Sequence, residues 1–187
     1  MDQKETFERV LGVLNNLEVE YLITGGFAVS FWGHPRSTHD LDILIKIKGS
    51  KEKLINLFRE HGFYISEEAI EGAIRHQSMF NIIHSESDLK IDFWVTDGNP
   101  DHDIEFKRKT EKNFLGKKVY LISPEDLILI KLEWFKKSNS TRHLLDASGI
   151  WDIQKDIIDL DYLKKRAITL DLAELLGDLA GNKFKNL

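Results

Sequence analysis

The sequence contains no cysteine, only three prolines and no long hydrophobic run. Without cysteine, disulfide bonds and thiolate metal sites are excluded, and a zinc site would depend on the seven histidines and on carboxylates. No apolar stretch approaches the roughly 20 residues that cross a bilayer. The N-terminal segment MDQKETFERV also lacks the basic-then-apolar order of a secretory signal. These absences predict a cytoplasmic protein with no membrane contact.

The chain also lacks an excess of positive charge, since its formal net charge is −5. This balance argues against a protein that mainly grips a nucleic-acid backbone through many phosphates. The charge is compatible with a small anionic ligand that is bound by a metal and a few nearby cations. It is also compatible with tRNA binding at a local basic patch, formed by residues 107–109 and 117–118. Hydrophobic residues make up 42% of the 187 residues, which is enough for a sizeable core.

The hydrophobic periodicity changes character along the chain. Helical spacing is expected over residues 5–17, 27–32, 51–61 and 124–137, and strand patterns over residues 20–24, 41–47, 79–84, 89–95 and 118–122. Short leucine-rich helices follow from 141 to 181. Mixed strands and helices followed by helices alone predict an α+β fold, with a core over residues 1–122 and a small helical C-terminal part over residues 123–187.

Two carboxylates stand at the head of a strand that is otherwise apolar. Because side chains alternate along a strand, Asp40 and Asp42 point to the same face. Two adjacent carboxylates repel each other and favour a divalent cation with a preference for oxygen ligands, Mg²⁺ or Mn²⁺. The alternative is an ordinary strand-edge pair that forms ion pairs with Arg36 or Lys46.

A third carboxylate, Asp92, lies in the apolar run LKIDFWV. If its strand lies next to that of Asp42, three carboxylates converge on one edge of the sheet. Such a set can hold two metals roughly 3.5–4 Å apart, an arrangement used for in-line nucleotidyl transfer. The alternative is a salt bridge from Asp92 to Arg36 or to Lys90, which points to the same side of the strand.

The glycine pair Gly25-Gly26 lies between a strand and a short helix. Glycine lets the backbone approach a ligand closely, and free N–H groups at a helix start favour phosphate oxygens. Other polar residues near these motifs have a simpler interpretation. His34 and His39 are expected to be loop residues, and Asp97, Asp101 and Asp103 are expected to be solvated, because they lack the pattern of a calcium loop. Trp32 and Trp94 are core candidates that could instead stack on a base.

The order strand, Gly25-Gly26, short helix, Arg36-x-Thr38-x-Asp40-x-Asp42, strand resembles the signature of the nucleotidyltransferase superfamily, with its polymerase beta-like fold. With the later helix that begins Pro124-Glu125-Asp126, it is similar to small bacterial nucleotidyltransferases related to AbiEii-type toxins. The resemblance implies a mixed sheet with flanking helices. It also implies that Asp40, Asp42 and Asp92 bind the catalytic Mg²⁺ or Mn²⁺, and that Asp92 acts on the attacking hydroxyl.

The resemblance also implies a set of nucleotide-binding residues, which comprises Gly25, Gly26, Arg36, Thr38, Lys131 and Asp146. Purely structural roles stay open for several of them. Arg36 would brace the carboxylates, and Thr38 would cap the turn before the strand. Lys131 would be a solvated lysine beside Glu133, and Asp146 would pair with Arg142 at i and i+4 of one helix.

These patterns together predict a metal-dependent enzyme. It would move an NMP group from an NTP to a hydroxyl acceptor, which is a small molecule, a tRNA or a protein, and would release pyrophosphate. The alternative is a non-catalytic or regulatory protein that binds a protein partner in a system of the toxin–antitoxin type on the same fold. Intact carboxylates at the three expected positions favour the enzyme.

Overall fold

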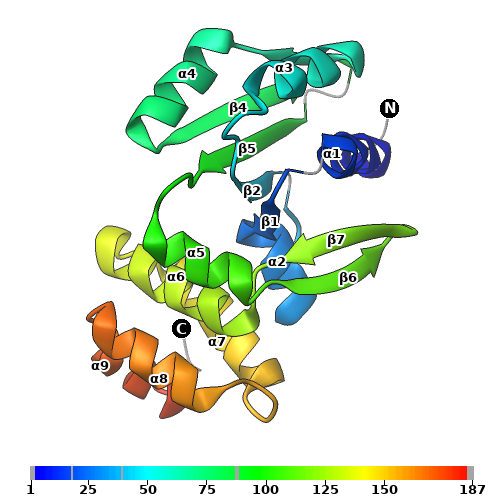
Figure 1. Ribbon diagram of the computed structural model, residues 1–187. Helices are drawn as coiled ribbons and strands as arrows, with labels where there is room; N and C mark the ends of the chain where they lie inside the picture. The colour runs from blue at the N-terminus through cyan, green and yellow to red at the C-terminus, as the bar shows by residue number, and fades with distance from the viewer. Residues whose placement is uncertain (1–2, 18, 39, 87–88, 185–187) are drawn as a thin grey trace. The chain divides into compact units, whose positions relative to one another are not determined.

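The computed structural model describes residues 3–17, 19–38, 40–86 and 89–184 (Figure 1). The chain divides into two compact units. Unit 1 comprises Met1–Phe27 and Thr38–Ile122, and unit 2 comprises Ala28–Ser37 and Ser123–Leu187. Helix α2 (Gly25–Trp32) therefore begins in unit 1 and ends in unit 2.

Unit 1 is built on one mixed sheet, with the strand order β3-β4-β5-β2-β1-β7-β6. Its strands are β1 (Tyr21–Thr24), β2 (Leu41–Ile45), β3 (Phe63–Ile65), β4 (Met79–His84), β5 (Lys90–Val95), β6 (Thr110–Phe114) and β7 (Lys117–Leu121). The pairs β2–β5 and β1–β7 are parallel, and the other neighbours are antiparallel. The predicted α+β class with a mixed sheet is confirmed.

Helices cover the apolar face of this sheet. They are α1 (Gln3–Leu17), α3 (Lys51–Glu60) and α4 (Glu67–His76), with α5 (Pro100–Lys107) following β5 (Figure 1). The Phe58 ring of α3 packs against Phe63 of β3 and Phe93 of β5, at centroid distances of 5.3 and 5.7 Å. Phe80 of β4 stacks on Phe93 at 5.1 Å. Because the strand period is two, this burial turns Asp92 to the other face.

Unit 2 is helical. After α2 it contains α6 (Pro124–Ser138), α7 (Thr141–Gln154), α8 (Leu160–Thr169) and α9 (Ala173–Ala180). Helix α6 packs on α7 and α8, and α9 packs on both α7 and α8. Ser123 caps α6, since its hydroxyl accepts a hydrogen bond from the Asp126 N–H, and Pro124 opens the first turn as the sequence predicts. None of the described helices combines the length and apolar character needed to cross a membrane.

Four elements were not expected from the sequence: β3, α4, α5 and β6. The strand predicted over residues 41–47 is two residues too long, since β2 ends at Ile45. The Asp97 carboxylate accepts hydrogen bonds from the Ile47 and Lys48 N–H groups, at 2.9 and 3.1 Å. These two N–H groups are therefore bound by a side chain and not by a neighbouring strand.

Candidate active site

One row of residues crosses the sheet of unit 1 at the head of β2. Thr24 pairs with Asp42, Asp42 pairs with Asp92, and Asp92 pairs with Asn81 on β4. The strand of Asp92 thus lies beside that of Asp42, and the two carboxylates belong to directly opposed residues. Residues in register on neighbouring strands present their side chains to the same face.

The glycine pair begins α2 directly after β1. Gly25 has φ +61°, in the left-handed region, and it lies against the Asp42 side chain. A Cβ built on Gly25 would come within 1.9 Å of Asp42 Oδ2. Only glycine therefore fits here, because the backbone conformation and the carboxylate both exclude a side chain. The start of α2 and the Asp42 carboxylate are in direct contact.

Asp92 is the most deeply buried carboxylate of the row, with 9% of its surface exposed. Its Oδ2 lies 3.0 Å from Lys90 Nζ, so the ion pair considered as an alternative is present. Its Oδ1 is buried and has no hydrogen-bond partner. A buried carboxylate oxygen without a partner is costly, and a cation or a hydroxyl donor at that position would satisfy it.

Lys90 lies among all three acids. Its hydrogen bond to Asp92 is the main cause of a raised Lys90 pKa, and the charges of Asp40 and Asp42 act in the same direction. Asp40 itself is exposed. Within the described residues, no group of three or more acidic or histidine side chains is placed to hold a metal ion. Among the described residues, Lys90 pairs with Asp92 and also experiences the negative charge of the other two carboxylates.

The two other cations considered as partners of Asp40 and Asp42 pair with other carboxylates. Arg36 pairs with Asp146. Lys46 lies 2.8 Å from Asp103 and 3.7 Å from Glu20.

Unit 2 contains a second polar cluster, formed by Arg36, Lys131 on α6 and Asp146 on α7. Arg36 makes two hydrogen bonds to the Asp146 carboxylate, from Nε at 2.8 Å and from Nη2 at 3.1 Å. Lys131 Nζ lies 2.8 Å from Asp146 Oδ2. The structure thus brings together three of the residues that the resemblance assigned to nucleotide binding, although they lie far apart in the sequence.

Asp146 is ionised by its partners in spite of its burial. Burial alone would raise the pKa of this carboxyl, but the hydrogen bonds and charges of Arg36 and Lys131 outweigh it, so the pKa is lowered. Two expectations are corrected here. Lys131 is a buried lysine and not a solvated one beside Glu133. Among the described residues, Asp146 forms its ion pairs with Arg36 and Lys131 and not with Arg142, because the former two point into the interior of the unit.

The remaining candidates have local roles. The Thr38 hydroxyl donates to the Asp40 carbonyl at 3.2 Å, as expected for a residue that shapes the turn before β2. His34 packs against α7, where a Cβ on Gly149 would lie 3.0 Å from its ring. His39 lies outside the described residues. Trp32 is buried, and Trp94 is half-buried on the same face of β5 as Asp92.

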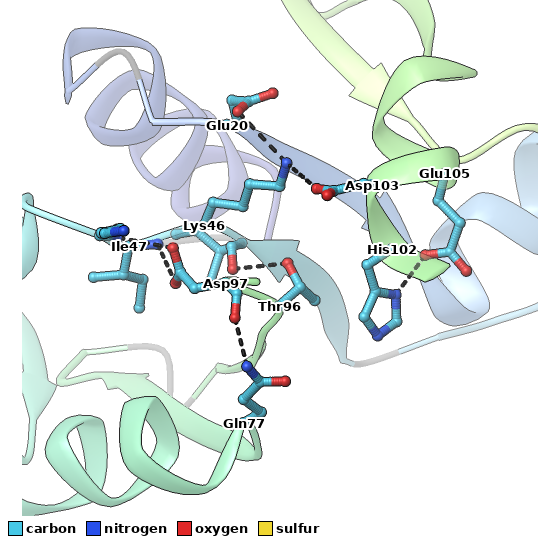
Figure 2. Close-up of polar contacts among 11 residues, drawn as sticks. Glu20, Lys46, Ile47, Gln77, Thr96, Asp97, His102, Asp103 and Glu105 are labelled. Atoms are coloured by element: carbon cyan, nitrogen blue, oxygen red, sulfur yellow. Dashed lines mark hydrogen bonds and ion pairs between the residues drawn. The ribbon is translucent and has the colours of Figure 1, made fainter. Parts of the chain in front are cut away.

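Asp97 and Asp103 contact other parts of unit 1 (Figure 2), and the side chain of Asp103 is solvated as expected, at 47% exposure. Asp97 holds the chain beyond β2 through two backbone N–H groups, and its own carbonyl accepts from Gln77 Nε2 at 2.5 Å. Asp103 lies on α5, an unexpected helix, and pairs with Lys46. These contacts fix the far ends of β2 and β5, and so support the strands that carry Asp42 and Asp92. The side chain of Asp101 lies outside the described residues.

Sequence reasoning missed Asn81 as a neighbour of the carboxylates. The sequence signal was weak, because four of the first five residues of MFNIIH are apolar, and the alternation of exposed and buried positions along β4 is seen only in the structure. The register with β5 places Asn81 opposite Asp92.

The chain matches the model of one protein family. The family model for aminoglycoside-2''-adenylyltransferases matches residues 6–143. No curated protein matches the chain.

Several solved structures share the fold. The lincosamide antibiotic adenylyltransferase LnuA with bound lincomycin is 19% identical, with a TM-score of 0.56, over 82% of this chain and 98% of that chain. ANT(2'')-Ia in complex with adenylyl-2''-tobramycin is 13% identical, with a TM-score of 0.62, over 90% and 97%. A nucleotidyltransferase-like protein from Paracoccidioides brasiliensis is 18% identical, with a TM-score of 0.64, over 98% and 90%.

Proposed function

We propose a reaction for this chain from the premise that it belongs to the aminoglycoside-2''-adenylyltransferase family. The chain is an enzyme of the nucleotidyltransferase class, and we assign it the transfer of an NMP group from an NTP, ATP in the first instance, to the hydroxyl of a small molecule. The observation that supports this most is the contact of the α2 start with Asp42, beside Asp92 in register.

The donor set fits a hard divalent cation. Asp42 and Asp92 are opposed carboxylates, and the buried Oδ1 of Asp92 has no partner. We propose that these two, with the exposed Asp40, hold Mg²⁺ or Mn²⁺, which prefer oxygen ligands. When bound, such ions would neutralise the triphosphate and stabilise the charge that develops during phosphoryl transfer.

The residues of the chain then have defined tasks. The backbone N–H groups at the start of α2, at Gly25 and Gly26, bind phosphate oxygens beside Asp42. Asp92 orients the acceptor hydroxyl, and its carboxylate takes the proton. The bond from the acceptor oxygen to the α-phosphorus forms as the bond from that phosphorus to pyrophosphate breaks. The protein acts by position and charge.

The cluster of unit 2 has a separate role. Asp146 holds Lys131 and Arg36 charged and fixed. We propose that these two cations contribute to nucleotide binding, with Asp146 as the residue that positions them. Thr38 contributes through the shape of the turn that leads to Asp40.

A small-molecule acceptor is favoured over a tRNA. The relatives named above carry lincomycin or adenylyl-tobramycin, according to their descriptions. The net charge is −5, and the basic residues considered for tRNA are partly engaged. Lys118 pairs with Glu111, and Lys109 lies 4.6 Å from the centre of the Tyr120 ring.

The competing proposal is the AbiEii-type relationship, in which the chain would bind a protein partner and would not catalyse a reaction.

Metal-dependent pyrophosphate release distinguishes the two proposals. Purified protein is incubated with each NTP, Mg²⁺ or Mn²⁺ and an acceptor panel of lincomycin, tobramycin and tRNA. We expect release with ATP and a small molecule, and loss of it in Asp42→Asn and Asp92→Asn. Glu60→Gln, at an exposed carboxylate of unit 1 on α3, is the matched control. Absence of release with every acceptor would refute the enzymatic proposal.

A further inference from the structure

The open face of the sheet continues from Asp92 away from the glycine pair. Asn81 of β4 lies opposite Asp92, Ile83 opposite Lys90, and Met79 opposite Trp94. Tyr64 of β3 lies opposite Ile83. These side chains share the face of Asp92, because residues in register on adjacent strands point to the same side. We call Tyr64, Met79, Ile83 and Trp94 the apolar strip.

The apolar strip is not part of the core. Tyr64 is 65% exposed, and Met79 and Ile83 are each 37% exposed, whereas Phe80 and Ile82, which alternate with them on β4, are buried. The solvated face of an antiparallel strand normally carries polar side chains. A row of exposed large apolar residues on one face therefore indicates a binding surface.

The position of the apolar strip relative to the glycine pair indicates which substrate it binds. In the strand order, β1 with its glycine pair lies on one side of β2 and β5, and β4 and β3 lie on the other. Nucleotide phosphates at Gly25-Gly26 would leave the β4 side of Asp92 for the group that attacks. We propose that the apolar strip binds the apolar face of the acceptor, with Asn81 as the residue that positions its hydroxyl beside Asp92. This inference rests on the proposed function.

The charges on the face of the sheet that carries the apolar strip indicate which class of acceptor it binds. Among the described residues of β3, β4 and β5 that share this face, Asp92 is the only carboxylate, and Lys90 lies next to Ile83. Asp42 faces the same side from β2, but Asp42 and Asp92 are the proposed metal ligands, and the apolar strip itself carries no carboxylate that could bind a polyamine. The acceptor is therefore a hydroxylated small molecule with an apolar face and little positive charge, more like a lincosamide than an aminoglycoside.

The chain offers a direct probe of the strip. It has two methionines, Met1 and Met79, and Met79 belongs to the strip. Protein labelled with ¹³C at the methionine methyls is saturated with Mg²⁺ and a non-hydrolysable ATP analogue, and is then titrated with lincomycin or with tobramycin. We expect lincomycin to shift the Met79 signal and leave Met1 unchanged, and tobramycin to shift neither.

The inference is overturned if Met79 stays unmoved by lincomycin, if it moves with tobramycin, or if the nucleotide analogue alone accounts for its full shift. In the last case the strip is a site for the base. Failure of the proposed function looks different, since it shows as absent pyrophosphate release, whatever Met79 does.

Kinetics give a second test. Met79→Glu places a carboxylate on the strip opposite Trp94, away from the Lys90–Asp92 pair, and we expect it to lower kcat/KM for lincomycin at least about tenfold with the KM for ATP unchanged. Ile168→Glu, at a residue of α8 that is 70% exposed, is the matched control and should leave both constants unchanged. An equal loss in the two variants, or a change confined to the KM for ATP, contradicts the assignment.

Discussion

Gly25 is the residue at which backbone conformation and site chemistry meet. It combines φ +61° with direct contact to the Asp42 carboxylate. A side chain there would strain the backbone and displace a carboxylate that we propose as a metal ligand. The two effects can be separated, because Gly49 also has a positive φ, +82°, with no atom within 4 Å of its would-be Cβ.

Gly25→Ala should therefore lower the rate of nucleotidyl transfer by about 100-fold, as expected when catalytic groups move by about 1 Å. Gly49→Ala should cost only about 1 kcal/mol in the free energy of unfolding, from backbone strain, with transfer unchanged. Pyrophosphate release and urea unfolding of both variants provide the measurements. Similar transfer rates in the two variants would show that the contact with Asp42 has no catalytic role.

Lys90 competes with any cation that binds the carboxylates, because its Nζ is 3.0 Å from Asp92 Oδ2. Lys90→Gln should raise the affinity for Mn²⁺ roughly two- to fivefold, the scale of an exposed ion pair worth less than about 1 kcal/mol. Electron paramagnetic resonance of free Mn²⁺ measures this directly. Lys118→Gln, which breaks an exposed pair with Glu111, is the control. Weaker Mn²⁺ binding in Lys90→Gln would instead make Lys90 a residue that holds Asp92 in place.

At the scale of elements, the helix cap that the sequence predicts at the N-terminus of α6 is formed by two buried residues. The Ser123 hydroxyl accepts from the Asp126 N–H at 3.1 Å and donates to Asp126 Oδ2 at 2.7 Å, and both residues are buried. Helix α6 also carries Lys131, so the cap anchors the helix that supports the cluster of unit 2.

Ser123→Ala should lower the free energy of unfolding by about 2 kcal/mol, since it removes a cap and leaves buried polar groups unpaired. Ser66→Ala removes the exposed cap of α4, which accepts one bond from the Ala69 N–H. It should cost about 0.5–1 kcal/mol. Urea unfolding curves test the difference, and equal losses at the two caps would mean that burial adds nothing at Ser123.

The elements with strong patterns were predictable. The strand over residues 79–84 was predicted with the bounds that β4 has, and α6 followed from Ser123 and Pro124. The missed elements had weak patterns for physical reasons. Strand β3 has three residues, too few for a period, and β6 (TEKNF) is an edge strand with no buried side. Helix α4 was detectable from Ser66 and the acids of its first turn.

Long-range pairing limits what the sequence reveals of the site. The glycine pair and the acids could be named from local patterns. That Asn81 opposes Asp92, and that Asp146 joins Arg36 across 110 residues, depends on strand order and helix packing. The i,i+4 rule favoured Arg142 as the partner of Asp146, but the structure pairs this buried carboxylate with the buried Lys131 and the half-buried Arg36.

At the scale of the molecule, the Arg36–Asp146–Lys131 cluster joins the three segments of unit 2 that meet around it: the segment before β2, α6 and α7. Asp146 has a lowered pKa because Arg36 and Lys131 outweigh its burial. A carboxyl group with a pKa lowered by folding stabilises the folded state above its ordinary value near 4, and this stabilisation is lost as the pH falls through the lowered value.

Asp146→Asn should therefore lower the free energy of unfolding by about 3 kcal/mol at pH 7, because it leaves the buried Lys131 without its counter-charge. The difference from the wild type should begin to shrink as the pH falls below about 4 and should vanish below the lowered pKa of the folded state, where the wild-type carboxyl is also neutral. Urea unfolding at several pH values measures it. Asp156→Asn, an exposed carboxylate after α7, should match the wild type throughout. A difference that is independent of pH would show that the charge of Asp146 does not stabilise the cluster.

The interleaving of the two units along the chain restricts how the enzyme can be divided or recombined. Residues Ala28–Ser37 lie inside the sequence of unit 1 but belong to unit 2. A gene shortened after codon 122 would therefore encode a fragment that exposes Val29 and Trp32, both buried in the whole protein. Exchange of the helical unit by a single crossover would pair foreign helices with the resident Ala28–Ser37 segment and its Arg36. New acceptor preferences are therefore expected to arise by point substitutions in a chain that keeps both units, and seldom by exchange of gene segments.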